Sequence, residues 1–589
     1  MKKLDIHVPF GLILIITEGC FIVGLLQYRY VFHLFFLEQY QLFLEGKEYA
    51  AELLSRPGGF IEYISEYCVQ FFHIDFVGCV SVAVILLLIG WLLHCLLKEK
   101  RGKDIYFLFE GIIVFFLLLN ILDIAFFFRG MVGYLFCIVC LYVYRQIQNS
   151  LFSVRLLWGI GLGCALFWIA APFQTLFLIT AGCLELKEHG FNKGRSLIWP
   201  ICTGVIVCSV YYWGGNGVCR IYMLPDGICS FQIILGWTKY VSWVLLPVAV
   251  LLMPLFNKLV GKIGNIYRIR IIQMSMLMVI FIFVLPKYDD GGSLPYKRLN
   301  HYAVNEKWDE ILDYCKRYSP EDFRCLNYQN LALAKKGILT DSLFAYNQKG
   351  GKGLFAPWDR TVYTAFVLQK VCYYYGNIAF AQKYAFEGNV CSTSRGFPET
   401  MKMLVRTNLL QKEYRVAAKY IYYLQQTSFY KDWADRQCRY LSVPDAVEED
   451  PQYAGKRQFL WQKNHFVLSN EFRMLASRNK DDRQLRNFVL CFYLLEKDLA
   501  GFLEWFNYYY YASSEYEDIP DVYYEALMVC STDIPEVLDR YRIPDSVKND
   551  FEMYNLIYRS AKDLKERKYR LSLYHADSYW FYFHYVNKQ

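Results

Sequence analysis

The chain has 589 residues, of which 55% are hydrophobic, 18% aromatic and only 20% charged. This composition excludes intrinsic disorder and fibrous repeats, and it is too apolar for an ordinary soluble protein. The formal net charge of +8 would suit nucleic-acid binding if the basic residues shared one face, but most of the excess lies in short loops between apolar segments. We therefore interpret the charge as an indicator of membrane orientation and expect no nucleic-acid partner.

Nine apolar segments within residues 1–286 are predicted to cross a lipid bilayer, which takes roughly 20 apolar residues each and somewhat fewer inside a bundle. The expected spans are 9–30, 74–97, 105–127, 131–144, 156–171, 173–184, 197–212, 235–256 and 271–286. The segment 156–184 is interpreted as two short helices or a re-entrant hairpin. The first segment carries Glu18 and lacks a small-residue cleavage site, so it is expected to remain as an anchor.

Basic residues, which stay on the cytoplasmic side of a membrane, predict the orientation. They cluster after the second, fourth, sixth and eighth spans, for example at Lys98–Lys103 and Lys258–Arg270. Only a cytoplasmic N-terminus keeps every cluster inside. The loops 31–73 and 213–234 and everything after residue 286 are then outside, and the chain is expected in a bacterial inner membrane with a periplasmic C-terminal domain.

The composition changes abruptly after Pro286, which predicts a linker at 287–299 and a separate α-helical domain at 300–589. Helix-breaking turns recur at Gly337, Gly376 and Lys412, a spacing of roughly 35 to 39 residues that is close to the ~34 of tetratricopeptide repeats. Alanines flank these turns. The segment 301–430 therefore resembles a tetratricopeptide-like solenoid, which implies a groove for a protein or peptide partner. A closed helical bundle is the alternative.

The first external loop is the most informative stretch for chemistry. It is expected to hold juxtamembrane helices at 38–73, interrupted at Pro57-Gly58-Gly59, because proline and paired glycines end one helix and precede another. The second of these helices has an apolar face and an acidic face, as expected for a helix lying on a membrane surface. Glu38 would then be held at the outer interface, just after the first span.

With these features, residues 1–286 resemble the GT-C class of integral-membrane glycosyltransferases. Members of that class have a cytoplasmic N-terminus, a first external loop with two juxtamembrane helices, and a catalytic carboxylate in that loop, to which Glu38 corresponds. The Asp-rich pair that many members carry is not found, so the sequence supports neither a divalent metal nor any other cofactor. The whole chain also resembles a Bacteroidota family of polytopic membrane proteins with the same two-part layout, which implies a role in the cell envelope.

The resemblance implies transfer of a sugar from a polyprenyl-phosphate donor at the outer face of the membrane. Glu38 would be the general base, and other polar residues would bind substrate. These are Gln39, Gln41, Arg56, Asp123, Arg129 and Arg220. Asp123 and Arg129 lie one or two helical turns apart and are a candidate ion pair. The plainer interpretation of all these residues is that they are solvated or salt-bridged loop residues.

Two other functions remain open. The chain could be a non-catalytic, membrane-anchored scaffold for assembly of envelope proteins, in which case any membrane anchor would serve. It could also be a transporter or flippase that uses the acids inside spans, Glu18, Glu110 and Asp123, as a proton relay, although no inverted repeat supports this. Cys219 and Cys229 flank an external loop and are a candidate disulfide, with two free thiols as the alternative.

Overall fold

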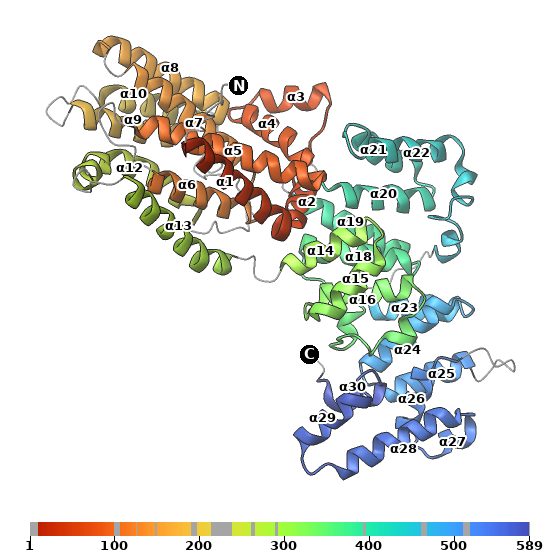
Figure 1. The fold of residues 1–589 in the computed structure, drawn as a ribbon. Helices are drawn as coiled ribbons and strands as arrows, with labels where there is room; N and C mark the ends of the chain where they lie inside the picture. Colours follow the sequence, from red (N-terminus) through yellow and green to blue (C-terminus); the bar gives the residue numbers. More distant parts are fainter. Residues whose placement is uncertain are drawn as a thin grey trace, which may run out of the picture. The chain divides into compact units, whose positions relative to one another are not determined.

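The computed structural model describes residues 10–98, 107–124, 126–147, 150–189, 197–213, 238–260, 266–288, 293–392, 396–460, 468–510 and 519–587. Every regular element within these ranges is a helix, so the predicted all-α class is confirmed (Figure 1). The chain divides into two compact units. The first consists of Met1–Leu294 with Gln426–Phe429, and the second of Pro295–Gln425 with Tyr430–Gln589.

The first unit is a bundle of long apolar helices, and each of the nine apolar segments of the sequence overlaps a helix. Its elements are α1 (Phe10–Leu25), η1 (Leu26–Tyr30), α2 (Val31–Tyr40), α3 (Lys47–Leu54), α4 (Gly59–Val69), η2 (Gln70–His73), α5 (Asp75–Leu97), α6 (Phe107–Ile121), α7 (Arg129–Gln146), α8 (Phe152–Ala170), α9 (Phe173–His189), α10 (Ile198–Trp213), α12 (Thr238–Val260) and α13 (Ile266–Tyr288).

Among the described residues of this unit, three helices are long and apolar enough to cross a membrane, namely Ile16–Tyr40, Asp75–Leu97 and Phe152–Ala170. Shorter apolar helices lie at Phe109–Ile121, Thr238–Leu252 and Ser275–Leu285. A spanning helix must offer roughly 20 apolar residues to the bilayer. The three long helices therefore indicate that this unit associates with a membrane.

The first helix is longer than predicted. α1 and α2 are joined by η1, a single π-helical turn, so the helix continues through Tyr40 instead of ending near residue 30. The residues from Val31 to Leu37 are apolar except for His33, and they include no glycine or proline that would end a helix. Glu38 consequently lies on the last turn of this first long helix, and the separate short helices of the loop begin only at Lys47 and Gly59.

The expected break at Pro57-Gly58-Gly59 separates α3 from α4. Gly58 has a φ of +79°, in the left-handed region that glycine adopts without strain. A Cβ added to Gly59 would lie 1.7 Å from the carbonyl oxygen of Leu53, so no side chain fits there. The turn also contacts α8, because Gly58 N donates a hydrogen bond to Trp168 O at 2.8 Å. The two glycines thus allow α4 to fold back against the bundle.

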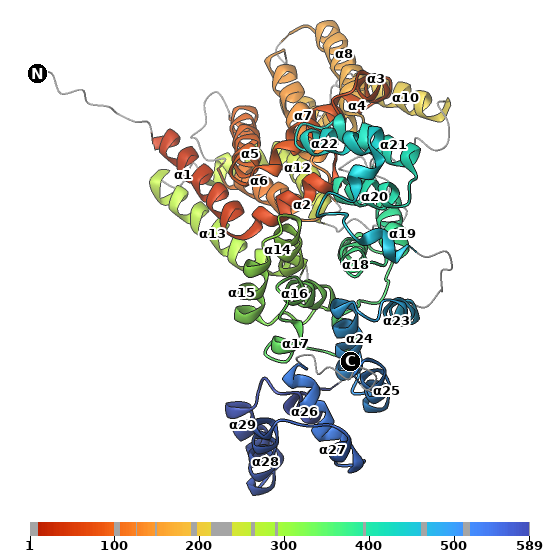
Figure 2. The same cartoon turned by 90° about the vertical axis from the view of Figure 1, so that its right-hand side faces the viewer.

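The second unit is a succession of shorter helices. They are α14 (Ser293–Val304), α15 (Trp308–Tyr318), α16 (Phe323–Lys335), α17 (Leu339–Ser342), η4 (Gly351–Gly353), α18 (Val362–Tyr374), α19 (Ile378–Val390), α20 (Pro398–Leu410), α21 (Tyr414–Gln425), α22 (Lys431–Ser442), η5 (Pro444–Val447), η6 (Lys456–Phe459), α23 (Leu468–Arg478), α24 (Arg483–Leu495), α25 (Leu499–Tyr510), α26 (Asp521–Cys530), α27 (Glu536–Arg540), α28 (Asp545–Ser560), α29 (Leu564–Tyr574) and α30 (Tyr579–Tyr585). Most pack on their neighbours in sequence, as α28 does with α29 beside α26 (Figure 2).

One turn geometry recurs in this unit. Among the described residues, five connections consist of three residues whose middle residue is left-handed, at Glu306, Gly337, Gly376, Lys412 and Lys497. In each, the backbone N–H after that residue donates to the carbonyl five residues earlier, at 2.8–3.0 Å. This is the Schellman end of a helix, which satisfies carbonyls that would otherwise lack partners. The second unit is therefore built from repeated helix–turn–helix elements.

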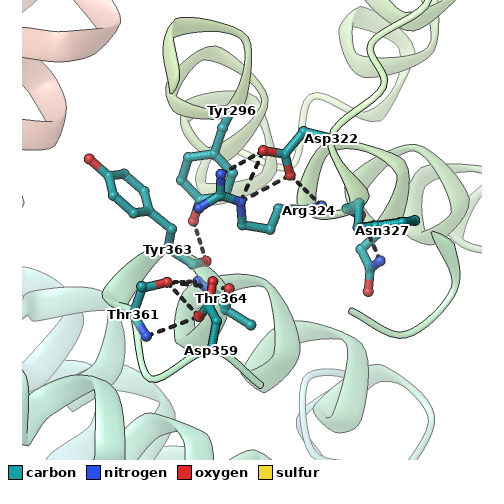
Figure 3. A network of polar contacts seen from close by, with 9 residues as sticks. Tyr296, Asp322, Arg324, Asn327, Asp359, Thr361, Tyr363 and Thr364 are labelled. Atoms are coloured by element: carbon teal, nitrogen blue, oxygen red, sulfur yellow. Dashed lines mark hydrogen bonds and ion pairs between the residues drawn. The ribbon is translucent and has the colours of Figure 1, made fainter. Parts of the chain in front are cut away.

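Three helices of the second unit, α14, α16 and α18, are tied together around one arginine (Figure 3). The Arg324 guanidinium donates to Asp322 Oδ1 at 2.9 Å and lies 5.5 Å from the ring centroid of Tyr296 and 5.4 Å from that of Tyr363. The Tyr296 hydroxyl donates to the backbone oxygen of Tyr363 at 2.7 Å. Because these residues come from α14, α16 and α18, the contacts fix the mutual packing of the three helices.

Candidate functional site

Polar groups gather at one end of the first unit, which we call the α2 end because α2 finishes there. His33 Nε2 on α2 is 2.9 Å from the carbonyl oxygen of Ile121, the last residue of α6. The side-chain oxygen of Gln41 accepts a hydrogen bond of 3.1 Å from Phe128 N, which directly precedes α7. Lys239 at the start of α12 forms an ion pair with Asp123 just after α6. These contacts join α2 and its C-cap residue Gln41 to the end of α6 and the beginning of α7, and they join the segment after α6 to the beginning of α12.

Glu38 is buried at the α2 end, with only 2% of its surface exposed. Gln39 Nε2 donates a hydrogen bond to Glu38 Oε2 at 2.6 Å, and His73 Nδ1 lies 3.8 Å from the same oxygen. The His73 ring lies 4.6 Å from Phe429 and 5.7 Å from Phe35. A carboxylate with an imidazole in this position has the chemistry to accept a proton from a hydroxyl group and to share the resulting charge.

Two of the predicted cations meet at one carboxylate. Arg56 NH2 is 2.8 Å from Glu62 Oε2, and Arg129 NH1 is 3.3 Å from Glu62 Oε1. Arg129 also lies over the Phe127 ring at 5.5 Å. Two guanidiniums around one carboxylate leave one net positive charge, which suits an anionic group such as a phosphate. The sequence identified both arginines as candidate site residues. It placed Glu62, the carboxylate that joins them, only on the polar face of a surface helix.

Asp123 has an ionic partner that was not predicted from sequence. Lys239 Nζ lies 3.1 Å from Asp123 Oδ2, and Arg129 forms an ion pair with Glu62. The Lys239 side chain is only 1% exposed. Sequence reasoning missed it because a lysine at the edge of an apolar segment looks like a flanking residue. Its one detectable signal was a charge inside the predicted span 235–256.

A buried amide lies beside this ion pair. Asn120 is 2% exposed, and Asp123 N donates to its backbone oxygen at 3.1 Å. Neither polar atom of the Asn120 side chain has a hydrogen-bond partner among the residues that the structure describes. Buried polar groups are almost always satisfied by protein, water or a ligand. The amide is therefore available to a bound molecule or water next to Asp123 and Lys239.

The other candidate residues lie elsewhere. Glu110 lies 3.0 Å from His94 Nδ1. His94 is in the last turn of α5 and Glu110 is in the first turn of α6, so this pair lies at the other end of these two helices from the α2 end. Arg220, Cys219 and Cys229 fall outside the described residues. Within the described part of the chain, no group of three or more His, Cys, Asp or Glu side chains could hold a metal ion. The α2 end thus brings together Glu38, Gln39 and the groups around Gln41, Glu62 and Asp123.

Comparison with known proteins identifies the family of this chain. Residues 5–586 match a family of unknown function, DUF6057, and the chain belongs to that family. No curated protein and no solved structure matches it.

Proposed function

We propose that this DUF6057 protein is a GT-C-like membrane glycosyltransferase that transfers a sugar from a polyprenyl-phosphate donor, with Glu38 as general base. In this proposal the chain crosses a bacterial inner membrane nine times, its N-terminus is cytoplasmic, and the α2 end faces the periplasm. A lipid-phosphate donor and an envelope acceptor, either a protein or a glycan, meet at that face. The DUF6057 family has no assigned function, so membership of it neither supports nor opposes this activity.

The observation that carries the proposal is the buried carboxylate at the end of the first long apolar helix. Glu38 has Gln39 and His73 beside its Oε2 atom, at 2.6 and 3.8 Å. A general base needs an acceptor hydroxyl within hydrogen-bonding reach, and in this proposal the acceptor and the lipid headgroup approach Glu38 from the end of α2. Glu38 is also the position that corresponds to the catalytic carboxylate of the GT-C class.

The proposed reaction balances without a metal ion. The Glu38 carboxylate takes the proton of the acceptor hydroxyl, the acceptor oxygen bonds to the anomeric carbon, and the bond from that carbon to the donor phosphate breaks. The lipid phosphate leaves with both bonding electrons. Arg129 and Arg56 stabilise the charge that develops on it, while Gln39 and Gln41 position the acceptor.

The test replaces Glu38 by glutamine, which keeps size and hydrogen bonding but removes basicity. Loss of a general base typically costs ~10²–10⁴ in rate. Envelope glycans and glycoproteins are compared in a deletion strain complemented with wild type, Glu38→Gln or Glu48→Gln. Glu48 is a matched control because it is an exposed glutamate on α3. We expect wild type and Glu48→Gln to restore the glycans and Glu38→Gln to fail.

Two results would count against the proposal. If the deletion strain has the same envelope glycans as the wild-type strain, the proposed transferase activity is ruled out. Full complementation by Glu38→Gln would remove Glu38 from the mechanism and leave the arginines as the remaining site.

A scaffold is the second candidate, and the repeated turns of the second unit favour it. Five Schellman turns of one geometry support a tetratricopeptide-like architecture in this proposal, and such architectures commonly present an extended surface to a protein or peptide. A chimera in which an unrelated anchor replaces residues 1–286 distinguishes the two functions. Complementation of the deletion strain by the chimera supports the scaffold. Failure of the chimera to complement, together with an inactive Glu38→Gln variant of the full chain, supports the transferase.

A further inference from the structure

The second unit contains a cavity of about 490 Å³ that is separate from the α2 end. It lies among η4, the loop after it, α19, α23 and α24. Its walls are predominantly aromatic and include Trp358, Phe380, Tyr384, Phe472, Phe488 and Phe492. Pockets that hold small molecules typically measure ≈300–1,000 Å³ and are mostly apolar with a few charged groups. The size and lining of this cavity therefore suit a small ligand.

The aromatic rings form two groups of packed side chains. The ring centroids of Trp358 and Tyr384 are 5.3 Å apart, and those of Phe472 and Phe488 are 4.6 Å apart. Phe355 lies 5.3 Å from Phe472 and extends the second group. Such spacing is typical of tilted and edge-to-face packing, in which ring faces remain available to a further ring. An aromatic or flat apolar group fits between these side chains.

The charges of the cavity are predominantly positive. Lys352, Lys383 and Arg473 line it, against a single carboxylate from Glu496. Glu496 is engaged in the fold, because its Oε1 atom accepts a hydrogen bond of 2.7 Å from Gly351 N. The lining therefore carries two net positive charges, which favour an anionic ligand.

Two of the three cations lie beside aromatic rings of the lining, whereas Lys352 Nζ lies 5.4 Å from the ring centroid of Phe323, which is not part of it. Lys383 Nζ lies 5.4 Å from the ring centroid of Phe380, and the Arg473 guanidinium lies 5.8 Å from that of Tyr493. Lys383 Nζ forms an ion pair of 4.0 Å with Glu387, one turn further along α19. In the part of the chain that the structure describes, Lys352 and Arg473 form no ion pair with a carboxylate. A bound anion would therefore meet two cations that no carboxylate already pairs with.

The lining also argues against a sugar. Recognition of a saccharide needs several donors and acceptors for its hydroxyl groups, whereas the polar side chains here are three cations, one engaged carboxylate and two tyrosines. An apolar wall with a cationic rim matches a molecule that has one apolar body and one negative charge.

We propose that this cavity is a binding site for a small aromatic carboxylate. The ring of the ligand lies against Trp358, Tyr384 and the phenylalanines, and its carboxylate faces Lys383 and Arg473. This site is independent of the proposed transferase centre, since every residue of it belongs to the second unit.

Photo-crosslinking of the full chain in detergent tests the proposal. The probes are para-benzoylbenzoate, its neutral methyl ester and the cationic para-benzoylbenzylamine, which share the benzophenone but differ in charge. Labelled peptides are identified by mass spectrometry. We expect the carboxylate to label the peptides covering 351–358, 380–384 and 472–496 at least tenfold more than the amine does, and excess phenylacetate to abolish that labelling.

Variants make the test specific to the cations. Lys383→Glu combined with Arg473→Glu reverses the net charge and should reduce labelling at least tenfold, whereas Lys419→Glu, on α21 and outside the cavity, should leave it unchanged. Arg473→Gln is the milder variant if the double reversal does not fold, and it should reduce labelling as well. Equal labelling by all three probes, no competition by phenylacetate in the wild type, or undiminished labelling of Arg473→Gln would each overturn the proposal.

Discussion

Glu399 on α20 is expected to be the most sensitive charged position of the second unit. Its carboxylate is 6% exposed and joins two lysines, Lys370 Nζ at 3.1 Å and Lys402 Nζ at 3.2 Å. Both ammonium groups are themselves mostly buried, with side chains 13% and 16% exposed. Replacing Glu399 by glutamine preserves the shape but leaves two buried cations without a counter-charge.

The size of the effect follows from burial. Breaking a buried pair by removing one partner costs about 3–5 kcal/mol, because the remaining charge stays desolvated. In a unit of this size we expect a fall in the unfolding temperature of roughly 5–15 °C. A matched control is Asp309→Asn, because Asp309 pairs with Lys336 at the shorter distance of 2.8 Å but is 72% exposed. Exposed pairs contribute only about 0–1 kcal/mol.

The pH dependence has a defined sign. Burial by itself raises the pKa of the Glu399 carboxyl, but the ammonium groups of Lys402 and Lys370 outweigh burial and hold that pKa well below its usual range. A carboxyl whose pKa is depressed on folding stabilises the protein above the unfolded pKa of about 4.3. The stabilisation is lost as the pH falls below that value. The difference between wild type and Glu399→Gln should therefore be full at pH 7 and shrink at pH 3.

Cys372 provides a local assay for this unfolding. It is fully buried on α18, two residues from Lys370, and becomes reactive when the helix opens. The full chain in detergent is heated with dithiodipyridine, which also reacts at acidic pH, and labelling of Cys372 is quantified by mass spectrometry. Glu399→Gln should expose Cys372 at a lower temperature than wild type or Asp309→Asn. If all three proteins expose it at the same temperature, the reasoning about buried charge is wrong.

Two further predictions concern stability. At the repeated turns, Lys412→Gly should stabilise the second unit by about 0.5–1 kcal/mol because Lys412 has a φ of +64°. Gly376→Ala should destabilise the unit by more than 1 kcal/mol, because the φ of Gly376 is +81° and the new Cβ would lie 2.5 Å from the Phe459 ring. Thermal unfolding of both variants checks this, and shifts of the unfolding temperature with the same sign would contradict it. Burial raises the pKa of Glu525 to about 7, from an unfolded value of about 4.3, so the stability it contributes falls as the pH rises through this range. Glu525→Gln should therefore unfold at a higher temperature than wild type at pH 8 and at the same temperature at pH 4, and an equal difference at both values would refute the assignment.

The sequence alone determined the helical elements and many of their ends. Apolar runs predicted the helices of the first unit, and Pro57-Gly58-Gly59 predicted the break between α3 and α4. Gly337 and Gly376 marked turns that the structure places in the left-handed region. These features depend on residues that are close in the chain, because helix formation, capping and turn conformation are decided within one or two turns. A pattern in the sequence is therefore sufficient to reveal them.

Only the tertiary structure decided which side chains meet. The pairing of Glu62 with Arg129, and of Lys239 with Asp123, joins helices that are distant in sequence. The cationic cavity likewise combines the segment 351–358 with residues from 472 to 496. An ionic or aromatic contact depends on how two helices pack, and periodicity identifies the buried face of each helix but not its partner.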